Sequence, residues 1–138
     1  MKIFVDTNIL LDVLTKRDPF YENSAVIWSL VEGGIVEGYI SAISVNNVFY
    51  ISKKLRDIEY AQGLVDKILK DFQIIELDYE ILKLSRTISD RDYEDLIQYF
   101  SAIRSGSKYL LTRNKDDFPE TGIDILEPAE FLQIFIGK

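Results

Sequence analysis

The feature that most restricts the fold of this chain is an alternation of short strand-like and longer helix-like apolar segments. Five short apolar runs are typical of strands: 2–5, 38–40, 74–77, 109–111 and 124–126. Strands that are separated by helices pair in parallel through right-handed crossovers. The pattern therefore predicts an α/β fold, a three-layer α/β/α sandwich with a central parallel sheet of about five short strands.

Helices are predicted between these strands because apolar residues recur there at three- and four-residue intervals. The predicted helices cover 9–14, 25–31, 45–55, 57–72, 79–86, 92–105 and 128–135. Gly33 and Gly106 follow two of them as stop signals, and Pro128 stands in the first turn of the last. No linker rich in Pro, Gly or Ser, no repeat and no low-complexity tract interrupts the pattern. We therefore expect residues 1–138 to form a single domain.

The absence of histidine and cysteine excludes many kinds of active site. The chain can have no disulfide, no thiolate nucleophile, no Ser-His-Asp triad and no metal centre that depends on Cys or His ligands. A metal bound by this chain must be held by oxygen ligands. That requirement favours a hard cation such as Mg²⁺, Mn²⁺ or Ca²⁺.

Charge and hydropathy restrict the partners and the cellular compartment that we expect for this protein. The chain has 16 Lys and Arg against 23 Asp and Glu, a formal net charge of −7. This balance argues against a protein that coats nucleic acid through a basic face, but not against an enzyme that meets phosphates through bound cations. Asp6 and Asp12 interrupt the first apolar run too early for a signal peptide, and no stretch approaches a membrane span. We expect a cytoplasmic protein with no membrane partner.

Acidic side chains gather at three places where a binding site is expected. Asp6 follows the first strand, Asp92 and Asp95 open the helix 92–105, and Asp117 lies in the loop after the strand 109–111. In open parallel sheets, ligands bind beyond the carboxyl ends of the strands. Carboxylates that converge there repel one another unless a cation neutralises them, and Mg²⁺ is commonly held by one or two carboxylates with phosphate oxygens and water.

Each of these positions also has a purely structural interpretation. Asp6 and Asp92 both suit the N-cap of the helix that follows, and acidic residues in a first turn favour the helix dipole. A charged loop after a strand, such as 112–118, is commonly a solvated turn. Capping explains Asp92 and Glu94 better than Asp95, which shares a helix face with Asp92. Only the combination of all three places favours a metal site.

Three segments carry a resemblance to a known family: DTNILLDVL at 6–14, DYEDLIQYFSAI at 92–103 and YLLTRNKDDF at 109–118. In this order and spacing, and over residues 1 to about 131, the chain resembles the PIN domain of bacterial and archaeal VapC-type toxins. The resemblance implies a single PIN-like domain with Mg²⁺- or Mn²⁺-dependent endoribonuclease activity. It also implies the toxin of a type II toxin–antitoxin pair, with an RNA substrate, a cognate antitoxin protein and a homodimer.

The resemblance assigns roles residue by residue. Asp6 matches the first metal-binding Asp of the family, and Asp95 matches the Asp of its central helix. The segment 109–118, here called the closing motif, can be aligned with the family in two registers. Either Asn114 occupies a position that is often Asp, or Asp117, one turn further on, supplies the carboxylate; we favour Asp117. We therefore expect Asp6, Asp95 and Asp117 to be the catalytic and metal-binding residues. The expected supporting residues are Asn47, Asp92, Glu94, Thr112 and Asn114.

The chain departs from the family at Asn47, where many members carry Glu. An Asn side chain supplies no negative charge, although its carbonyl can ligate a metal or hold a water. Asp12 and Asp92 are possible substitutes, and Asp12 is equally interpretable as a solvated helix residue. The departure leaves an alternative function open: a catalytically weak or inactive PIN-like domain that binds RNA or a protein partner.

Two further interpretations bear on substrate binding and on function class. The candidates for phosphate contact are Lys53, Lys54, Arg56, Arg113 and Lys115, of which the first three also suit an exposed helix end. The aromatic residues Tyr21, Trp28, Phe49 and Tyr50 are interpreted as core or dimer surface rather than as base-stacking platforms. A phosphotransfer domain is disfavoured because Asn8 stands where a dehalogenase-like phosphatase needs the second Asp of Asp-x-Asp.

Overall fold

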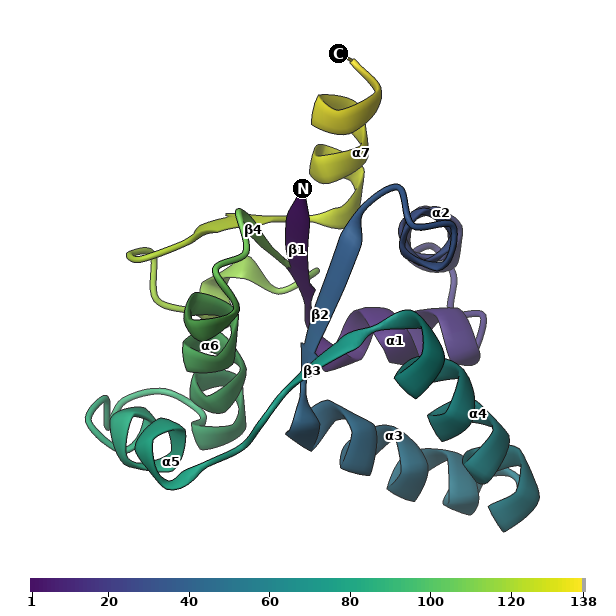
Figure 1. The fold of residues 1–138 in the computed structure, drawn as a ribbon, viewed down its shortest axis with the longest axis horizontal. Helices are drawn as coiled ribbons and strands as arrows, with labels where there is room; N and C mark the ends of the chain where they lie inside the picture. Colours follow the sequence, from purple (N-terminus) through teal and green to yellow (C-terminus); the bar gives the residue numbers. More distant parts are fainter. Residues whose placement is uncertain (138) are drawn as a thin grey trace.

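A single parallel sheet forms the centre of the molecule in the computed structural model, which describes residues 1–137. Its strands are β1 (Lys2–Val5), β2 (Glu37–Ser41), β3 (Gln73–Ile75), β4 (Tyr109–Leu111) and β5 (Asp124–Leu126). They lie in the order β3-β2-β1-β4-β5, and every neighbouring pair is parallel. Because β1 lies in the middle, residues that follow it are placed at the centre of the carboxyl edge (Figure 1).

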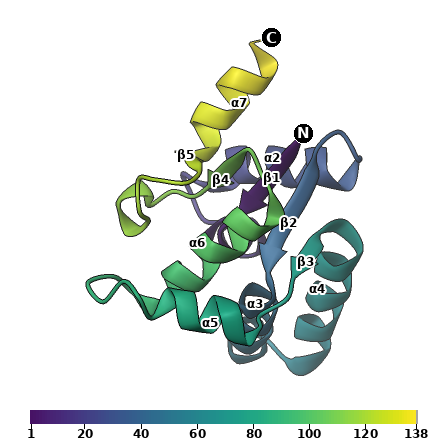
Figure 2. The same ribbon diagram turned by 60° about the vertical axis from the view of Figure 1, so that its left-hand side comes forward.

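Seven α-helices and a short 3₁₀-helix are found within residues 1–137. They are α1 (Thr7–Leu14), α2 (Tyr21–Glu32), α3 (Ala42–Leu55), α4 (Ile58–Asp71), α5 (Tyr79–Ser85), α6 (Tyr93–Ser105), η1 (Lys115–Asp117) and α7 (Pro128–Ile136). The two views in Figures 1 and 2 show α5 and α6 on one side of the sheet and α1, α2, α3 and α4 on the other. The three-layer α/β/α arrangement predicted from the alternation of segments is confirmed.

The alternation of side chains along β1 divides the core into two parts. Ile3 and Val5 face a large cluster that includes residues of α1, α2, α4 and α7, whereas Phe4 faces a smaller cluster built on α6. Successive side chains of a strand point to opposite faces, so a fully apolar strand such as β1 must be covered on both. All three side chains are buried, as the unbroken apolar run predicts.

Local signals set the ends of the helices near the carboxyl edge. Ser41 and Asp92 cap α3 and α6 by accepting hydrogen bonds from the amides of Ile43 and Asp95. Gly106 ends α6 in the left-handed conformation at φ 70°, which glycine adopts without a steric penalty. These caps fix where α3 and α6 leave the sheet, and therefore which side chains they present at its edge.

The third strand differs from the expected one by a shift toward the N-terminus. The apolar run predicts a strand over 74–77, but β3 covers Gln73–Ile75. Its partner β2 ends at Ser41, which pairs with Ile75 and caps the next helix. Beyond that point the chain has no neighbouring strand with which to pair.

Gly38 of β2 lies directly against the large core cluster. A Cβ at Gly38 would lie 2.7–2.8 Å from side-chain atoms of Val31 and Phe72. Only glycine fits this approach of the strand to the helical layer. No helix in the described part of the chain is both long enough and apolar enough to cross a membrane.

Candidate functional site

Asp6 stands at the end of the central strand and is buried, with 3% of its surface exposed. Its Oδ2 accepts a hydrogen bond of 2.8 Å from the Thr112 hydroxyl, and its amide donates to the carbonyl of Leu111. The ends of β1 and β4 are therefore joined through both backbone and side chains. Asp6 occupies the N-cap position of α1, but its side chain caps no amide. The capping interpretation of this carboxylate is therefore wrong.

The first amide of α1, which the Asp6 side chain does not cap, is bound by a polar network instead. The Thr7 amide, first in α1, donates to Oε1 of Gln98 over 3.0 Å, and the Thr7 hydroxyl is 2.6 Å from that of Ser44. Gln98 is 2% exposed and belongs to α6. This network connects α1, α3 and α6 beneath the carboxyl edge and leaves Asp6 free to face the cavity above it.

A cavity of about 330 Å³ opens at this edge between α1, α3 and α6. Its lining consists of Asp6, Thr7, Asn8, Leu11, Asn47, Tyr50, Ile51, Glu94, Asp95 and Gln98. Asp6, Glu94 and Asp95 bring three carboxyl groups into one cavity, although they come from positions almost ninety residues apart. Five of the expected site residues thus lie in or beside it, since Asn47 also lines the wall and Asp92 caps the helix that carries the acids.

Asn47 contacts one of these carboxylates directly. Its Nδ2 donates a hydrogen bond of 2.7 Å to Oε1 of Glu94. The side chain at the slot where many family members have Glu is therefore a donor that holds a Glu from α6. The carboxylate that α3 lacks is present in the same cavity, but it comes from the neighbouring helix.

Burial raises the pKa of all three carboxyl groups of the cavity, and neighbouring negative charges add to this effect for Glu94 and Asp95. Burial, together with the negative charges of Asp92, Asp6, Asp117 and Glu94, raises the pKa of Asp95 to about 7. Burial also raises the pKa of Glu94, again with Asp92 and Asp6 contributing. For Asp6 the effect of burial exceeds the opposing hydrogen bond from Thr112, and its pKa is raised as well. The cluster therefore carries unfavourable negative charge that a cation would neutralise.

The closing motif contributes Thr112, which holds the Asp6 carboxylate, and Asp117, whose charge acts on Asp95 from outside the cavity. Thr112 is buried, and its Oγ1 accepts from the Asn114 amide over 3.1 Å while donating to Asp6. Asn114 precedes η1, and Asp117 ends it as an exposed residue. Neither lines the cavity, but the charge of Asp117 acts on Asp95. Asp117 therefore stands at the rim rather than inside the site.

Asp12 and Arg113 form an ion pair that the sequence did not reveal. The Nε of Arg113 donates to Oδ2 of Asp12 over 2.8 Å, and Asp12 is 1% exposed. The guanidinium also lies 4.6 Å from the centroid of the Phe20 ring. The interpretation of Asp12 as a solvated helix residue is wrong, since the first helix turns this side chain inward to meet Arg113. The pair ties the closing loop to α1.

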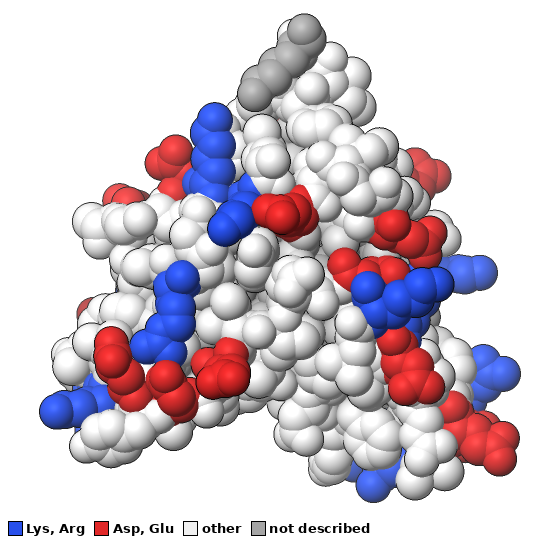
Figure 3. All heavy atoms as spheres, viewed as in Figure 1, with Lys and Arg blue, Asp and Glu red and all other residues white. Residues whose placement is uncertain are grey.

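The other basic residue of the closing motif is also engaged. Lys115 pairs with Glu130 over 3.0 Å. On the face of the molecule in Figure 3, basic and acidic side chains are intermixed rather than gathered into one basic surface. This distribution agrees with the net charge of −7.

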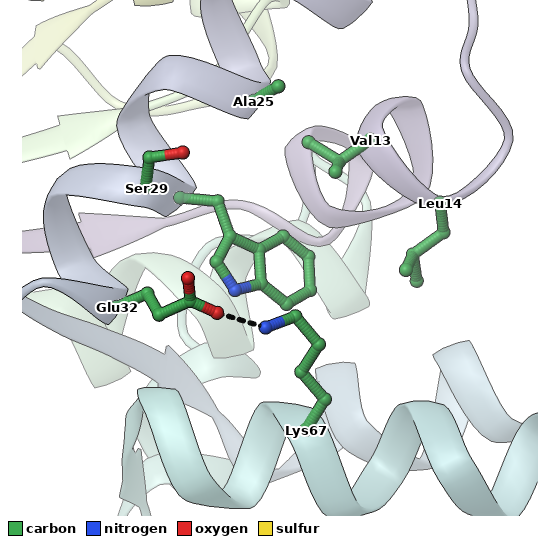
Figure 4. Close-up of a pocket in the computed structure, with 7 residues that line it drawn as sticks. Val13, Leu14, Ala25, Ser29, Glu32 and Lys67 are labelled. Atoms are coloured by element: carbon green, nitrogen blue, oxygen red, sulfur yellow. Dashed lines mark hydrogen bonds and ion pairs between the residues drawn. The ribbon is translucent and has the colours of Figure 1, made fainter.

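A second cavity, of about 190 Å³, lies on the far side of α1, between α1, α2 and α4 (Figure 4). Lys67 pairs there with Glu32 and, over 3.0 Å, with Asp71, which also accepts from the Trp28 indole. The pKa of Asp71 is lowered by the Trp28 and Lys67 hydrogen bonds, which outweigh the opposing effect of burial. Trp28 is buried in the core, as expected. This cavity brings together a structural network of hydrogen bonds rather than a set of repelling acids.

The donor set of the acidic cavity fits a hard divalent cation. All its candidate ligands are oxygens, and no Lys or Arg of the described residues lines the cavity to neutralise its carboxylates. Within residues 1–137, no three acidic side chains already converge as a preformed metal cage. Binding would therefore draw carboxylates from the cavity wall and rim toward the ion.

Comparison with known proteins identifies the fold family. The family model described as the PIN domain matches residues 2–116. The chain belongs to the PIN domain family. Its sequence is 24% identical over 137 residues to Ribonuclease VapC1 of Aquifex aeolicus, an alignment that covers 96% of this chain and 94% of that protein.

Solved structures share the fold of this PIN domain. VapBC2 from Rickettsia felis, bound to a DNA fragment from its promoter, matches with a TM-score of 0.63 and 21% identity over 92% of this chain and 98% of that one. VapC20 of Mycobacterium tuberculosis, a sarcin-ricin loop cleaving toxin, matches with a TM-score of 0.62 and 12% identity over 78% and 86%. The PIN-like α/β architecture expected from the sequence is confirmed.

Sequence reasoning missed the residues that hold this PIN-domain site in place. Gln98, Ser44 and Thr7 were not among the expected site residues. The one available signal for Gln98 was a polar residue among the buried positions of α6, three residues after Asp95. Its hydrogen-bond partner, Thr7, is 91 residues away in the chain, so no local pattern could identify it.

Proposed function

We propose that this PIN-domain protein is a divalent-metal-dependent endoribonuclease that hydrolyses RNA phosphodiester bonds and serves as the toxin of a type II toxin–antitoxin pair. The observation that carries the proposal is the cavity at the end of β1, which Asp6, Glu94 and Asp95 line and where burial and neighbouring negative charges raise the pKa values of Glu94 and Asp95. The likeness to Ribonuclease VapC1 supports the same conclusion.

Each side chain has a distinct role in this proposal. Asp6 and Asp95 hold the cation, Mg²⁺ or Mn²⁺, and Asp117 completes its environment from the rim. When bound, such an ion polarises a phosphoryl group and lowers the pKa of an attacking water. Thr112 keeps Oδ2 of Asp6 oriented, and Asn47 restrains the carboxylate of Glu94. Asn114 supports the closing motif through its bond to Thr112.

The proposed partners are suggested by solved structures that share this fold. The structures from Rickettsia felis and Salmonella typhimurium are VapBC complexes bound to DNA. We propose a cognate antitoxin protein for this chain, together with a homodimer and a cytoplasmic location. The whole of residues 1–138 is proposed to act as one PIN-like domain.

Metal-dependent cleavage of a structured RNA tests the proposal. Purified protein should cut the RNA in Mn²⁺ or Mg²⁺ and stop when EDTA is added. Asp6→Asn and Asp95→Asn should lose this activity, whereas Asp66→Asn, which removes an exposed acid of α4, should keep it. Cleavage that survives both site substitutions would show that a different site, or a contaminant, does the cutting.

A second function, RNA or protein binding without cleavage, is favoured by one observation. Asn47 brings no charge to the cavity, and the described residues hold no preformed group of three acidic ligands. Calorimetry with Mn²⁺ separates the two functions. Heat of binding that Asp6→Asn removes supports the nuclease, and no binding at millimolar Mn²⁺ supports the binding module.

A further inference from the structure

One face of α3 leads from the acidic cavity to the exposed end of the helix. Asn47, Tyr50 and Ile51 line the cavity, and Lys54 follows at the next position of the same face. Residues three, four and seven apart share one side of a helix. At 1.5 Å of rise per residue, the face extends about 10 Å from Asn47 to Lys54.

Tyr50 is the aromatic residue at the mouth of this cavity, and 53% of its surface is exposed. It belongs to neither hydrophobic core cluster. The Nζ of Lys54 lies 4.6 Å from the centroid of its ring, in the geometry of a cation–π contact. Of the two interpretations given for Tyr50, core or dimer surface, the structure therefore excludes the core. Its ring is presented to solvent beside the carboxylates.

The charges around the cavity make this face the suitable approach for a phosphate backbone. Among the residues that the structure describes, no Lys or Arg lines the cavity, and its carboxylates repel phosphate. The sequence of α3 contains no acidic residue, and its last turn carries Lys53 and Lys54. No acidic side chain of residues 1–137 pairs with either lysine, whereas Arg113 and Lys115 are engaged by Asp12 and Glu130.

We propose that this face of α3 binds a single-stranded segment of RNA next to the cleavage site. A base stacks on the ring of Tyr50, and the ammonium of Lys54 contacts the adjoining phosphate. Single-stranded nucleic acids bind other proteins through this pairing of an aromatic platform with a cation. The inference rests on the proposed ribonuclease function and adds the part of the surface that recognises the strand.

The neighbouring surface suits a different ligand, a protein chain, and the experiment must distinguish it from RNA. A cavity of about 270 Å³ beside this face is lined by apolar residues such as Leu11, Leu14 and Leu55. Its lining suits a protein chain, whereas the exposed Tyr50 ring and a Lys54 ammonium that no carboxylate of residues 1–137 pairs with suit a nucleic acid. We therefore assign the Tyr50–Lys54 face to RNA.

Fluorescence anisotropy with a labelled single-stranded RNA oligonucleotide, in EDTA to prevent cleavage, tests the assignment. Tyr50→Ala should weaken binding about tenfold, because stacking of one base is lost. Tyr50→Phe keeps the ring and should bind within about twofold of wild type. Lys54→Gln should reduce the slope of log affinity against log salt by about 0.7, the value for one contact with a single strand.

Two exposed residues away from this face provide matched controls. Tyr79→Ala removes a tyrosine that is 77% exposed and does not line the cavity. Lys70→Gln removes an exposed lysine from the last turn of α4. Both should leave affinity and salt slope unchanged. Thermal unfolding of all variants verifies that an exposed substitution has not altered the fold.

The outcomes separate this inference from the proposed function. Wild-type affinity in Tyr50→Ala, or an equal loss in Tyr50→Phe, overturns the stacking platform even if metal-dependent cleavage is normal. The predicted losses in a protein that never cuts RNA in Mn²⁺ support the RNA-binding face and refute the nuclease. If Tyr50→Ala and Lys54→Gln both bind RNA with wild-type affinity and salt slope, the face is left to protein docking and the inference is overturned.

Discussion

Asp95→Asn should stabilise the metal-free protein while it abolishes metal-dependent cleavage. Asp95 is partly buried among four other acidic groups that, with burial, raise its pKa from 3.8 to about 7. Its side chain makes no hydrogen bond or ion pair to any residue in the range 1–137. Replacing the carboxylate by an amide of the same shape therefore removes repulsion without leaving a donor or acceptor unmatched.

The size of the effect follows from the pKa. At about 1.4 kcal/mol per pH unit, a pKa of about 7 in place of 3.8 corresponds to about 4 kcal/mol for the fully charged group. Asp95 is partly exposed, so solvent screening reduces the expected gain to about 1–2 kcal/mol. For a chain of 138 residues this is a rise of roughly 3–8 °C in Tm.

The pH dependence has a definite sign. Because the folded-state pKa is raised, the folded protein holds this proton more tightly than the unfolded chain does. The wild-type stability associated with Asp95 is complete below about pH 4 and is lost as the pH rises through about 7. The advantage of Asp95→Asn should therefore be full at pH 8, decrease below pH 7 and vanish near pH 4.

Differential scanning calorimetry in EDTA across this pH range is the appropriate assay. Asp66→Asn, which removes one exposed acid from α4, controls for the change in net charge. Saturating Mn²⁺ should then raise the Tm of the wild type but not that of Asp95→Asn, because a ligand stabilises only the protein that binds it. An unchanged or lower Tm for Asp95→Asn at pH 8 would refute the repulsion assigned to the cluster.

Three further substitutions test other contacts of the structure. Arg113→Gln should cost about 3 kcal/mol of unfolding free energy because it leaves Asp12 buried without its partner, and adding Asp12→Asn should restore part of that loss in urea denaturation. Thr112→Val should destabilise by about 1–3 kcal/mol and weaken Mn²⁺ binding by calorimetry, because the carboxylate of Asp6 loses its donor; unchanged affinity would contradict a positioning role. Gly38→Ala should lower stability by about 1–3 kcal/mol in the same denaturation assay, since its Cβ meets core atoms at 2.7–2.8 Å, and wild-type stability would mean that the core yields easily there.

The fold was largely predictable because its strands are short, apolar and buried on both faces. Val5 and Leu111 lie in runs that no amphipathic helix would produce, and both are fully covered. The length of β3 was not predictable, since it is limited by Ser41 of a different segment, where the partner strand ends. Local pattern therefore indicates that a strand exists, while its partner determines where pairing stops.

In the site, too, local pattern indicates individual residues but not the partners that they contact. Strand-end position identifies Asp6, and motif spacing identifies Asp95, without knowledge of the fold. The partners that give these side chains their properties could not be found, because they are distant in the chain. Thr112 reaches Asp6 across 106 positions, and Arg113 reaches Asp12 across 101. The metal-binding roles themselves stay predictions until an ion is measured.

The central place of β1 in the sheet has a consequence for the synthesis of this protein. β1 is flanked by β2 and by β4, which is encoded more than a hundred residues later. At 5–20 residues per second, Asp6 waits about 5–20 s for Thr112 to be made. A nascent or truncated chain therefore lacks the donor that orients its buried carboxylate. The carboxyl edge of the sheet around Asp6 is therefore completed only after the segment that carries Thr112 has been translated.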